Sequence, residues 1–285
     1  MGTLRYGTSS WSEKSWEGIF YPAGLKPAQY LASYASRFDT VEADSTYYRA
    51  PSPAMVMGWR ERTPDGFVLS AKFPRAIVHG GAREQPDPAR LLLPEHTAAE
   101  VERFLAAMAF LGPKCGPLVL QFPYFNRATF SAAGPFLERL EGFLGRLPGQ
   151  FRYAVEIHNK AWVTGELLGL LRAKRTAFVL VDLLYMPHPA DLATELELIT
   201  TDFSYARLIG DRKAVEAQTK TFDRIVIDQS SRLARWAHLL RDVAARTAVT
   251  FVYANNHYAG HGPATVAELR RRVEGGEEPP PCTTG

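Results

Sequence analysis

The most constraining feature of the chain is the alternation of short β-rich runs with longer stretches of helical period. Repeated β–α units of this kind build a parallel sheet. Several runs are almost continuously apolar, as strands covered on both faces should be. The sequence therefore predicts an α/β fold, a single (β/α)8 TIM-type barrel of eight parallel strands with an outer helix ring. The expected strands are 4–7, 40–43, 67–71, 118–122, 153–157, 177–181, 205–209 and 250–253.

Three of the intervening stretches carry an apolar stripe at helical spacing. Segment 97–111 opens with Thr97 and Glu100, which are spaced as a capping box. Segments 131–146 and 230–246 show the same 3.6-residue period. All three are expected to be helices of the outer ring.

The length of 285 residues suits one barrel domain, expected over residues 1–274. The composition of 275–285, GGEEPPPCTTG, predicts a disordered C-terminal tail. Two unpatterned stretches, 79–96 and 183–199, each follow an expected strand. Ordered loops of this length often act as lids or mouth elements, so we expect both at the catalytic face.

The composition restricts the expected location of the protein and the kinds of partner that it could bind. No apolar run approaches the length of a membrane span, and the first residues do not resemble a secretory signal, so a cytoplasmic protein without a membrane partner is expected. Cys115 and Cys282 lack the spacing of a disulfide framework or a zinc finger. The formal net charge of +3 is too small to indicate a nucleic-acid binder by itself.

Polar side chains gather where the expected strands end, which is where barrels of this type carry their chemistry. Glu42, Lys72, Glu156 and Arg207 would each be costly to bury unpaired, so a mutually neutralising cluster is expected. A purely structural polar layer is the alternative. The expected catalytic residues are Glu42, Lys72, Glu156 and Asp182. The expected substrate-binding residues are Trp11, Tyr48, Arg49, Gln121, His158, Trp162, Arg207, Asn255, Asn256 and His257.

Aromatic side chains also fall near the strand ends, and their flat faces suit stacking on nucleobases or sugar rings. They are Trp11, Trp16, Tyr47, Tyr48, Tyr124, Phe125, Trp162 and Tyr258. For any one of them packing beneath the loops is the commoner role, but together they favour a ring-shaped ligand. Four cations follow the seventh strand, where many barrels bind phosphate, but the signal is weak because a lysine-rich loop is usually just solvated. They are Arg212, Lys213, Lys220 and Arg224.

A set of ordered motifs carries a family resemblance: GTSSW at 7–11, TVEADSTYYR at 40–49, LQFP at 120–123, TTDFSYARLIG at 200–210 and YANNHYAGHGP at 253–263. From about residue 4 to 273 the chain resembles the YecE-like family, domain of unknown function 72. The resemblance implies a (β/α)8 barrel and supplies no established activity. The polar mouth positions that it implies are Trp11, Glu42, Ser45, Tyr48, Arg49, Lys72, Gln121, Glu156, Trp162, Arg207, Asn255 and Asn256.

The chain departs from the family pattern at three positions. His158 and Asn159 stand where the family commonly has an arginine and a histidine, and Ile209 stands where a histidine is common. A mechanism that relies on a histidine at 159 or 209 therefore does not transfer to this chain.

Three kinds of function fit these residues. The first is an enzyme, a hydrolase or isomerase, acting on a phosphorylated, nucleotide-like or sugar-like ligand, with Glu156 or Glu42 as acid or base and Lys72 and Arg207 stabilising negative charge. A glycoside hydrolase using Glu42 and Glu156 is a variant. The second is a non-catalytic module that binds single-stranded nucleic acid or another macromolecule.

A metal-dependent phosphodiesterase or isomerase is the third kind. Its candidate metal ligands are Glu42, Glu156, Asp182, His158 and His257. No HxH or HExxH spacing supports it, and no nucleotide-cofactor motif occurs, so the sequence names no cofactor. A small-molecule or nucleotide-like ligand is the expected partner, and the oligomeric state is not indicated.

Overall fold

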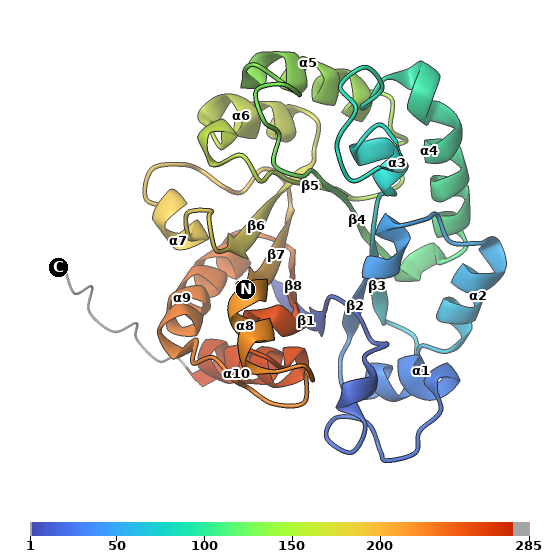
Figure 1. Cartoon of the computed structure of the whole chain (residues 1–285), viewed down its shortest axis with the longest axis vertical. Helices are drawn as coiled ribbons and strands as arrows, with labels where there is room; N and C mark the ends of the chain where they lie inside the picture. The colour runs from blue at the N-terminus through green and yellow to red at the C-terminus, as the bar shows by residue number, and fades with distance from the viewer. Residues whose placement is uncertain (1, 82, 276–285) are drawn as a thin grey trace.

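The structure, a computed structural model, describes residues 2–81 and 83–275. Eight parallel strands form one sheet in the order β1-β8-β7-β6-β5-β4-β3-β2, and helices surround it (Figure 1). This nearly closed barrel confirms the predicted fold, and every predicted strand position holds a strand. The strands are β1 (Thr3–Thr8), β2 (Thr40–Ala43), β3 (Val68–Lys72), β4 (Cys115–Gln121), β5 (Tyr153–Glu156), β6 (Ala177–Leu183), β7 (Phe203–Gly210) and β8 (Val249–Ala254).

The three predicted outer helices are present, but one of them begins at an earlier residue than expected. Segments 131–146 and 230–246 correspond to α5 and α9, but α4 begins at Pro94, so Thr97 lies inside it and caps nothing. Proline suits the first turn of a helix, and the Thr97 hydroxyl donates to Leu93 O. The α-helices are α1 (Tyr30–Ala35), α2 (Pro53–Glu61), α3 (Arg75–Val78), α4 (Pro94–Ala109), α5 (Ala133–Leu144), α6 (Gly165–Ala173), α7 (Pro189–Leu192), α8 (Arg212–Gln218), α9 (Ser230–Arg246) and α10 (Gly262–Gly275).

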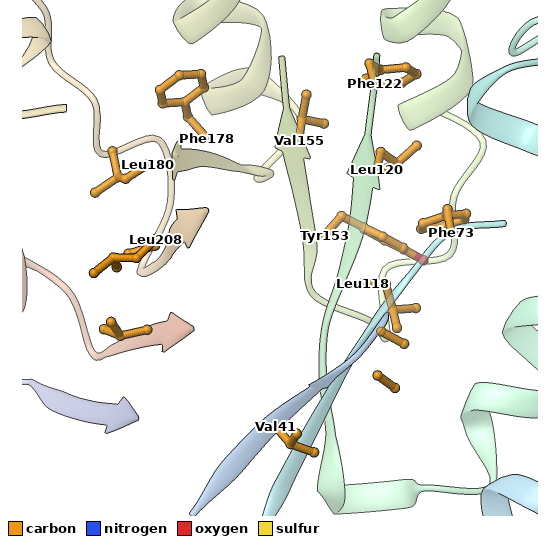
Figure 2. Packing of buried hydrophobic residues seen from close by; sticks show 14 of the residues in the cluster. Val41, Phe73, Leu118, Leu120, Phe122, Tyr153, Val155, Phe178, Leu180 and Leu208 are labelled. Carbon is orange, nitrogen blue, oxygen red and sulfur yellow. The ribbon is translucent and has the colours of Figure 1, made fainter. Parts of the chain in front are cut away.

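Two apolar layers follow from the two faces of the strands, because successive strand residues point to opposite sides. Val119, Val179, Tyr205 and Phe251 belong to a cluster made of strand residues alone, which fills the lumen. The alternate positions, such as Leu120, pack outward beneath the helices, and Figure 2 shows part of this layer. Which side a strand residue faces therefore decides whether it can contribute to a site in the lumen.

The ring of strands has one seam, between β1 and β2, which the sheet order does not join by a ladder. Side chains bridge it. The Tyr34 hydroxyl accepts from Thr8 N at 2.7 Å and donates to Thr40 O at 3.3 Å. Asp39 accepts from Tyr6 N at 3.2 Å. The strands approach closely there, since a Cβ on Gly7 would lie 2.1 Å from Thr40 O.

One of the two long loops directly follows a strand, as predicted, whereas the other is separated from β3 by the short helix α3. Segment 79–93 leads from α3 to α4, and the segment after β6 contains the short helix α7. The predicted tail 275–285 lies outside the described residues apart from Gly275, which ends α10. Among the described helices, none combines the length and apolar character needed to cross a membrane.

We expect Gly7→Ala to lower the free energy of unfolding by about 3 kcal/mol or more, because the added methyl group collides with the backbone of β2 and forces the strands apart. Gly169→Ala is the matched control. Gly169 lies in α6 with open space around it, so alanine there should stabilise the protein by about 0.5–1 kcal/mol. Urea denaturation measures both, and a Gly7→Ala variant as stable as the wild type would refute the close contact at the seam.

Candidate functional site

One guanidinium joins four strands at the carboxyl end of the lumen. Arg207 of β7 lies 2.5 Å from a Glu156 carboxylate oxygen and 2.9 Å from a Glu42 carboxylate oxygen. It also donates to the Gln121 side-chain oxygen at 2.9 Å. Glu42 and Glu156 are fully buried and Arg207 is 2% exposed. The predicted charged cluster therefore exists, and Arg207 is its centre.

The Glu42 carboxylate links Arg207 to the neighbouring strands. Its second oxygen accepts from the Tyr205 hydroxyl at 2.7 Å, and Lys72 Nζ lies 3.8 Å from its first. Lys72 forms its closest ion pair with Asp44, which follows β2. Burial opposes ionisation of Asp44, but the Lys72 ammonium outweighs it and lowers the pKa of that carboxyl. Thr46 fixes the backbone here, since its hydroxyl accepts from Lys72 N at 2.9 Å.

Glu156 also holds His158, two residues further along the chain. His158 Nε2 lies 2.6 Å from the carboxylate oxygen that Arg207 leaves free. Burial alone would raise the pKa of Glu156, but the Arg207 guanidinium and His158 more than offset it and lower the pKa to about 2. An ionised carboxylate only accepts, so His158 Nε2 donates to it. No described residue bonds to Nδ1.

The network carries a small excess of negative charge. Glu42, Asp44 and Glu156 are three carboxylates, whereas Lys72 and Arg207 are two cations. His158 would add the positive charge that makes the network neutral only with a proton on both ring nitrogens. Beneath it, the Tyr253 hydroxyl lies 2.7 Å from the Thr40 hydroxyl and 2.8 Å from that of Ser70, which closes the floor with neutral groups.

Three tyrosines are exposed on the loops that follow β2, β4 and β6. Tyr48 is 70% exposed, Tyr124 is 61% exposed and Tyr185 is 52% exposed. Tyr185 stands edge-on to the His158 ring, with 6.2 Å between the ring centres. The pKa of Tyr185 is raised, by burial first and then by Glu156. Tyr185 therefore belongs to the surroundings of the network.

Asp182 lies apart from this network, unlike the expectation that it is catalytic. It pairs in register with Leu208, which faces the helix layer, whereas Val181 pairs with Arg207. Its carboxylate accepts from Trp236 Nε1 and from the Tyr258 hydroxyl, each at 2.9 Å, and forms an ion pair with Arg232. These bonds anchor α9 and the β8 end to β6. Burial opposes ionisation of Asp182, but Arg232 lowers its pKa.

Several of the expected ligand-stacking aromatics pack internally instead. Trp162 lies against Phe125 and Phe136, with ring centres 5.8 and 5.4 Å apart. Trp16 and Tyr258 are almost fully buried. Of the expected set, Tyr48 and Tyr124 are exposed, while Trp11 is half-buried and stands edge-on to Trp59.

The residues after β8 serve mainly local structure. Asn255 accepts from His257 N at 2.9 Å, and Asn256 accepts from Gly262 N at 2.9 Å at the start of α10. His257 packs on Phe222 with 4.8 Å between ring centres. Arg49 is exposed beside Tyr48. The cations after β7 lie on or beyond α8, and Arg212 there pairs with Glu216 at 2.7 Å.

Sequence reasoning missed three members of this region. These are Asp44, which lies within the motif TVEADSTYYR, and the tyrosines Tyr205 and Tyr185. Tyr205 could have been found from the period of two, because it lies two residues before Arg207 on the same strand. Nothing local in the sequence distinguishes Tyr185 from a packed loop residue.

The described residues contain no group of three or more His, Cys, Asp and Glu side chains that could hold a metal ion. Of the candidate ligands, Glu42 and Glu156 are both bound to Arg207, and Asp182 and His257 have other partners. The donor set therefore does not fit the metal-dependent hypothesis.

The fold and the site define a class: a (β/α)8 barrel with a buried carboxylate–guanidinium network at the carboxyl end of its strands. The chain belongs to the family described as "Protein of unknown function DUF72", whose model matches residues 5–284.

Relatives agree with this assignment. The chain is 36% identical over 162 residues to the UPF0759 protein YecE of Escherichia coli K12. The aligned segment covers 56% of this chain and 50% of YecE. The match thus spans only half the length of that relative. A DUF72 family protein from Thermotoga maritima matches with a TM-score of 0.73 at 24% identity, covering 95% of this chain and 99% of the other. One from Enterococcus faecalis gives 0.69 at 17% identity, covering 95% and 96%. These two structures support the fold.

We expect Arg207→Ala to lower the free energy of unfolding by about 3–5 kcal/mol, because it leaves two buried carboxylates without their shared cation. Urea denaturation at neutral pH measures the loss. Arg212→Ala removes an exposed ion pair and should change stability little. Equal, small effects of both substitutions would show that the network adds nothing to stability.

Glu156 makes stability depend on acid pH. Its pKa is about 2 in the folded protein against an ordinary value of 4.5, so its stabilisation is complete above 4.5 and is lost as the pH falls through about 2. In the Glu156→Gln variant, the free energy of unfolding should fall less steeply between pH 4.5 and about 2 than it does in the wild type. Urea midpoints taken across this range measure the slope, and parallel curves would contradict the lowered pKa.

Proposed function

We propose that this protein is an enzyme of the isomerase type that moves a proton next to a carbonyl group of a polyhydroxylated ring-forming substrate, such as a sugar. The observation that carries the proposal is the His158–Glu156 pair. Glu156 orients the imidazole through Nε2, and Arg207 fixes Glu156 in turn. A base held by a carboxylate, with its second nitrogen free of any bond to a described residue, is the arrangement that general base catalysis needs.

The charge of the site supports a neutral, hydroxyl-rich substrate over a phosphate bound directly to the network. Three carboxylates against two cations repel a phosphate but accept hydrogen bonds from hydroxyl groups. Tyr185, which is 52% exposed and stands edge-on to the His158 ring, offers a stacking surface for a sugar ring beside the proposed base. The same charge argues against single-stranded nucleic acid as the main ligand.

The chemistry of Glu156 favours an isomerase over a glycoside hydrolase. A glycosidase needs one carboxylic acid whose raised pKa keeps it protonated. The pKa of Glu156 is lowered to about 2, so this carboxyl cannot serve as that acid near neutral pH. Its ionised form stabilises an imidazolium at His158 instead, which helps the histidine accept a proton.

The reaction then needs no external oxidant or reductant. His158 Nδ1 takes the proton from the carbon next to the carbonyl, and the electron pair of that C–H bond forms a C=C bond while the carbonyl electrons move to oxygen. We assign the stabilisation of the resulting enediolate to Lys72, whose ammonium pairs with Asp44 and lies 3.8 Å from Glu42. Return of the proton to the neighbouring carbon, with exchange of the hydroxyl proton, completes the isomerisation.

Solvent exchange tests the proposal whichever product is formed. The protein is incubated with a panel of aldoses and ketoses in D2O, and proton NMR follows loss of the C–H signal next to the carbonyl. We expect exchange with at least one sugar, and a loss of about 100-fold or more in His158→Gln, because proton transfer by a placed base contributes that much.

His238→Gln is the matched control, since His238 lies exposed on α9 and pairs with Asp242. It should exchange at the wild-type rate. Failure of every sugar to exchange would overturn the proposal, as would exchange that is undiminished in His158→Gln. Oligonucleotide binding that falls steeply with salt would favour the nucleic-acid module instead.

A further inference from the structure

Asp44 is the carboxylate of the charged network that solvent reaches. It directly follows β2, and Lys72 Nζ contacts both Glu42 and Asp44, so these two carboxylates lie on the same side of the strand with Asp44 nearer its carboxyl end. The Asp44 side chain is 37% exposed, whereas those of Glu42 and Glu156 are fully buried. A molecule that approaches the network from the mouth therefore meets the Asp44 carboxylate first.

Only one oxygen of this carboxylate has a partner among the described residues. Oδ1 forms the ion pair with Lys72, and no described residue donates to Oδ2. Burial opposes ionisation of Asp44, but the Lys72 ammonium lowers the pKa, so the carboxyl group is charged near neutral pH. An ionised carboxylate accepts hydrogen bonds and donates none. Asp44 Oδ2 therefore suits a ligand hydroxyl group and does not suit a carbonyl or carboxylate oxygen.

The contact with Lys72 specifies which hydroxyl group this is. In the proposed reaction, the Lys72 ammonium stabilises the oxygen of the substrate's carbonyl group, and an ammonium has three donors and no acceptor. Asp44 and Lys72 are in direct contact, so the substrate group next to the carbonyl oxygen lies against Asp44. In a sugar, that group is the hydroxyl on the neighbouring carbon.

We infer that Asp44 determines specificity at the mouth by accepting a hydrogen bond from the substrate hydroxyl on the carbon next to the carbonyl group. This role rests on the proposed function for the position of the carbonyl oxygen. It names the substrate class as α-hydroxy aldehydes and ketones. A sugar without this hydroxyl leaves a charged acceptor unpaired in the complex, and sites built to bind a hydroxyl group reject the deoxy analogue for that reason.

A purely structural role of Asp44, holding Lys72 in place, is the competing explanation. Removal of the Asp44 charge would then weaken every sugar alike, because a displaced Lys72 affects all of them. A direct contact instead couples Asp44 to one hydroxyl group of the ligand. Comparison of the protein variant with the deoxy ligand, singly and together, measures this coupling.

Ligand-observed NMR titration of the full chain measures the dissociation constants of D-glucose, D-galactose and D-allose. Each is compared with its 2-deoxy derivative, which lacks the hydroxyl next to the carbonyl carbon, and with its 6-deoxy derivative, which lacks only the terminal hydroxyl. We expect at least one parent sugar to bind and its 2-deoxy derivative to bind at least about tenfold more weakly, the loss expected for a hydrogen bond to a charged group. The 6-deoxy derivative should bind much like the parent.

Two variants at this position locate the contact. In Asp44→Asn and in Asp44→Ala, the difference between the parent sugar and its 2-deoxy derivative should largely disappear, because the charged acceptor is gone. Asp65→Asn is the matched control, since Asp65 is fully exposed between α2 and β3 and lies 4.0 Å from Lys114. It should keep the wild-type discrimination, and melting temperatures show whether each variant is folded.

Equal binding of the parent and 2-deoxy sugars by the wild type would overturn this role of Asp44. So would discrimination that survives both Asp44→Asn and Asp44→Ala, or the absence of binding by every sugar. The proposed isomerase fails by a different result, namely sugars that bind but do not exchange the proton next to the carbonyl group in D2O. The two failures are therefore distinguishable.

Discussion

The neutralisation of two buried carboxylates by one guanidinium is the constraint on which the mouth of this barrel depends. Glu42 and Glu156 are fully buried and both contact Arg207, so loss of this guanidinium would leave two buried carboxyl groups without their shared cation. The three residues come from β2, β5 and β7, and Gln121 adds β4. The register of four strands is therefore tied to one side chain, and the positions of Tyr205, Lys72 and His158 follow from it.

The barrel and most of this network could be predicted because the signals are local. A strand of alternating burial and a charged residue at its carboxyl end are both visible in a few consecutive letters, as at Glu156 and Arg207. Asp182 looks the same in sequence. Its outward orientation depends on its register with Leu208 and on the partners that α9 supplies, both of which are non-local.

The aromatic residues show the same limit. Trp162 and Tyr48 both follow strands, yet Trp162 packs among phenylalanines and Tyr48 faces outward. The difference comes from which helix covers each loop, which the spacing of residues does not encode. Pro94 is another case. Helix α4 begins at this proline, so Thr97 and Glu100 already lie inside the helix and do not form a capping box at its start.

His158 gives this chain a different character from the pattern of its family. An arginine, which is common at that position, would add a permanent cation beside Glu156, whereas an imidazole can gain or lose a proton there. The role proposed for this position therefore rests on the histidine of this chain and not on the family pattern.

The seam between β1 and β2 has a consequence for how the barrel moves. Seven of the strand junctions are held by backbone ladders, but this one is held by the Tyr34 hydroxyl, Asp39 and the close fit at Gly7. Separating β1 from β2 breaks a few side-chain bonds and no ladder, so the barrel opens most cheaply there. Such breathing would leave a curved eight-stranded sheet with β1 still attached to β8, and amides along this line should exchange with solvent before those of the other junctions.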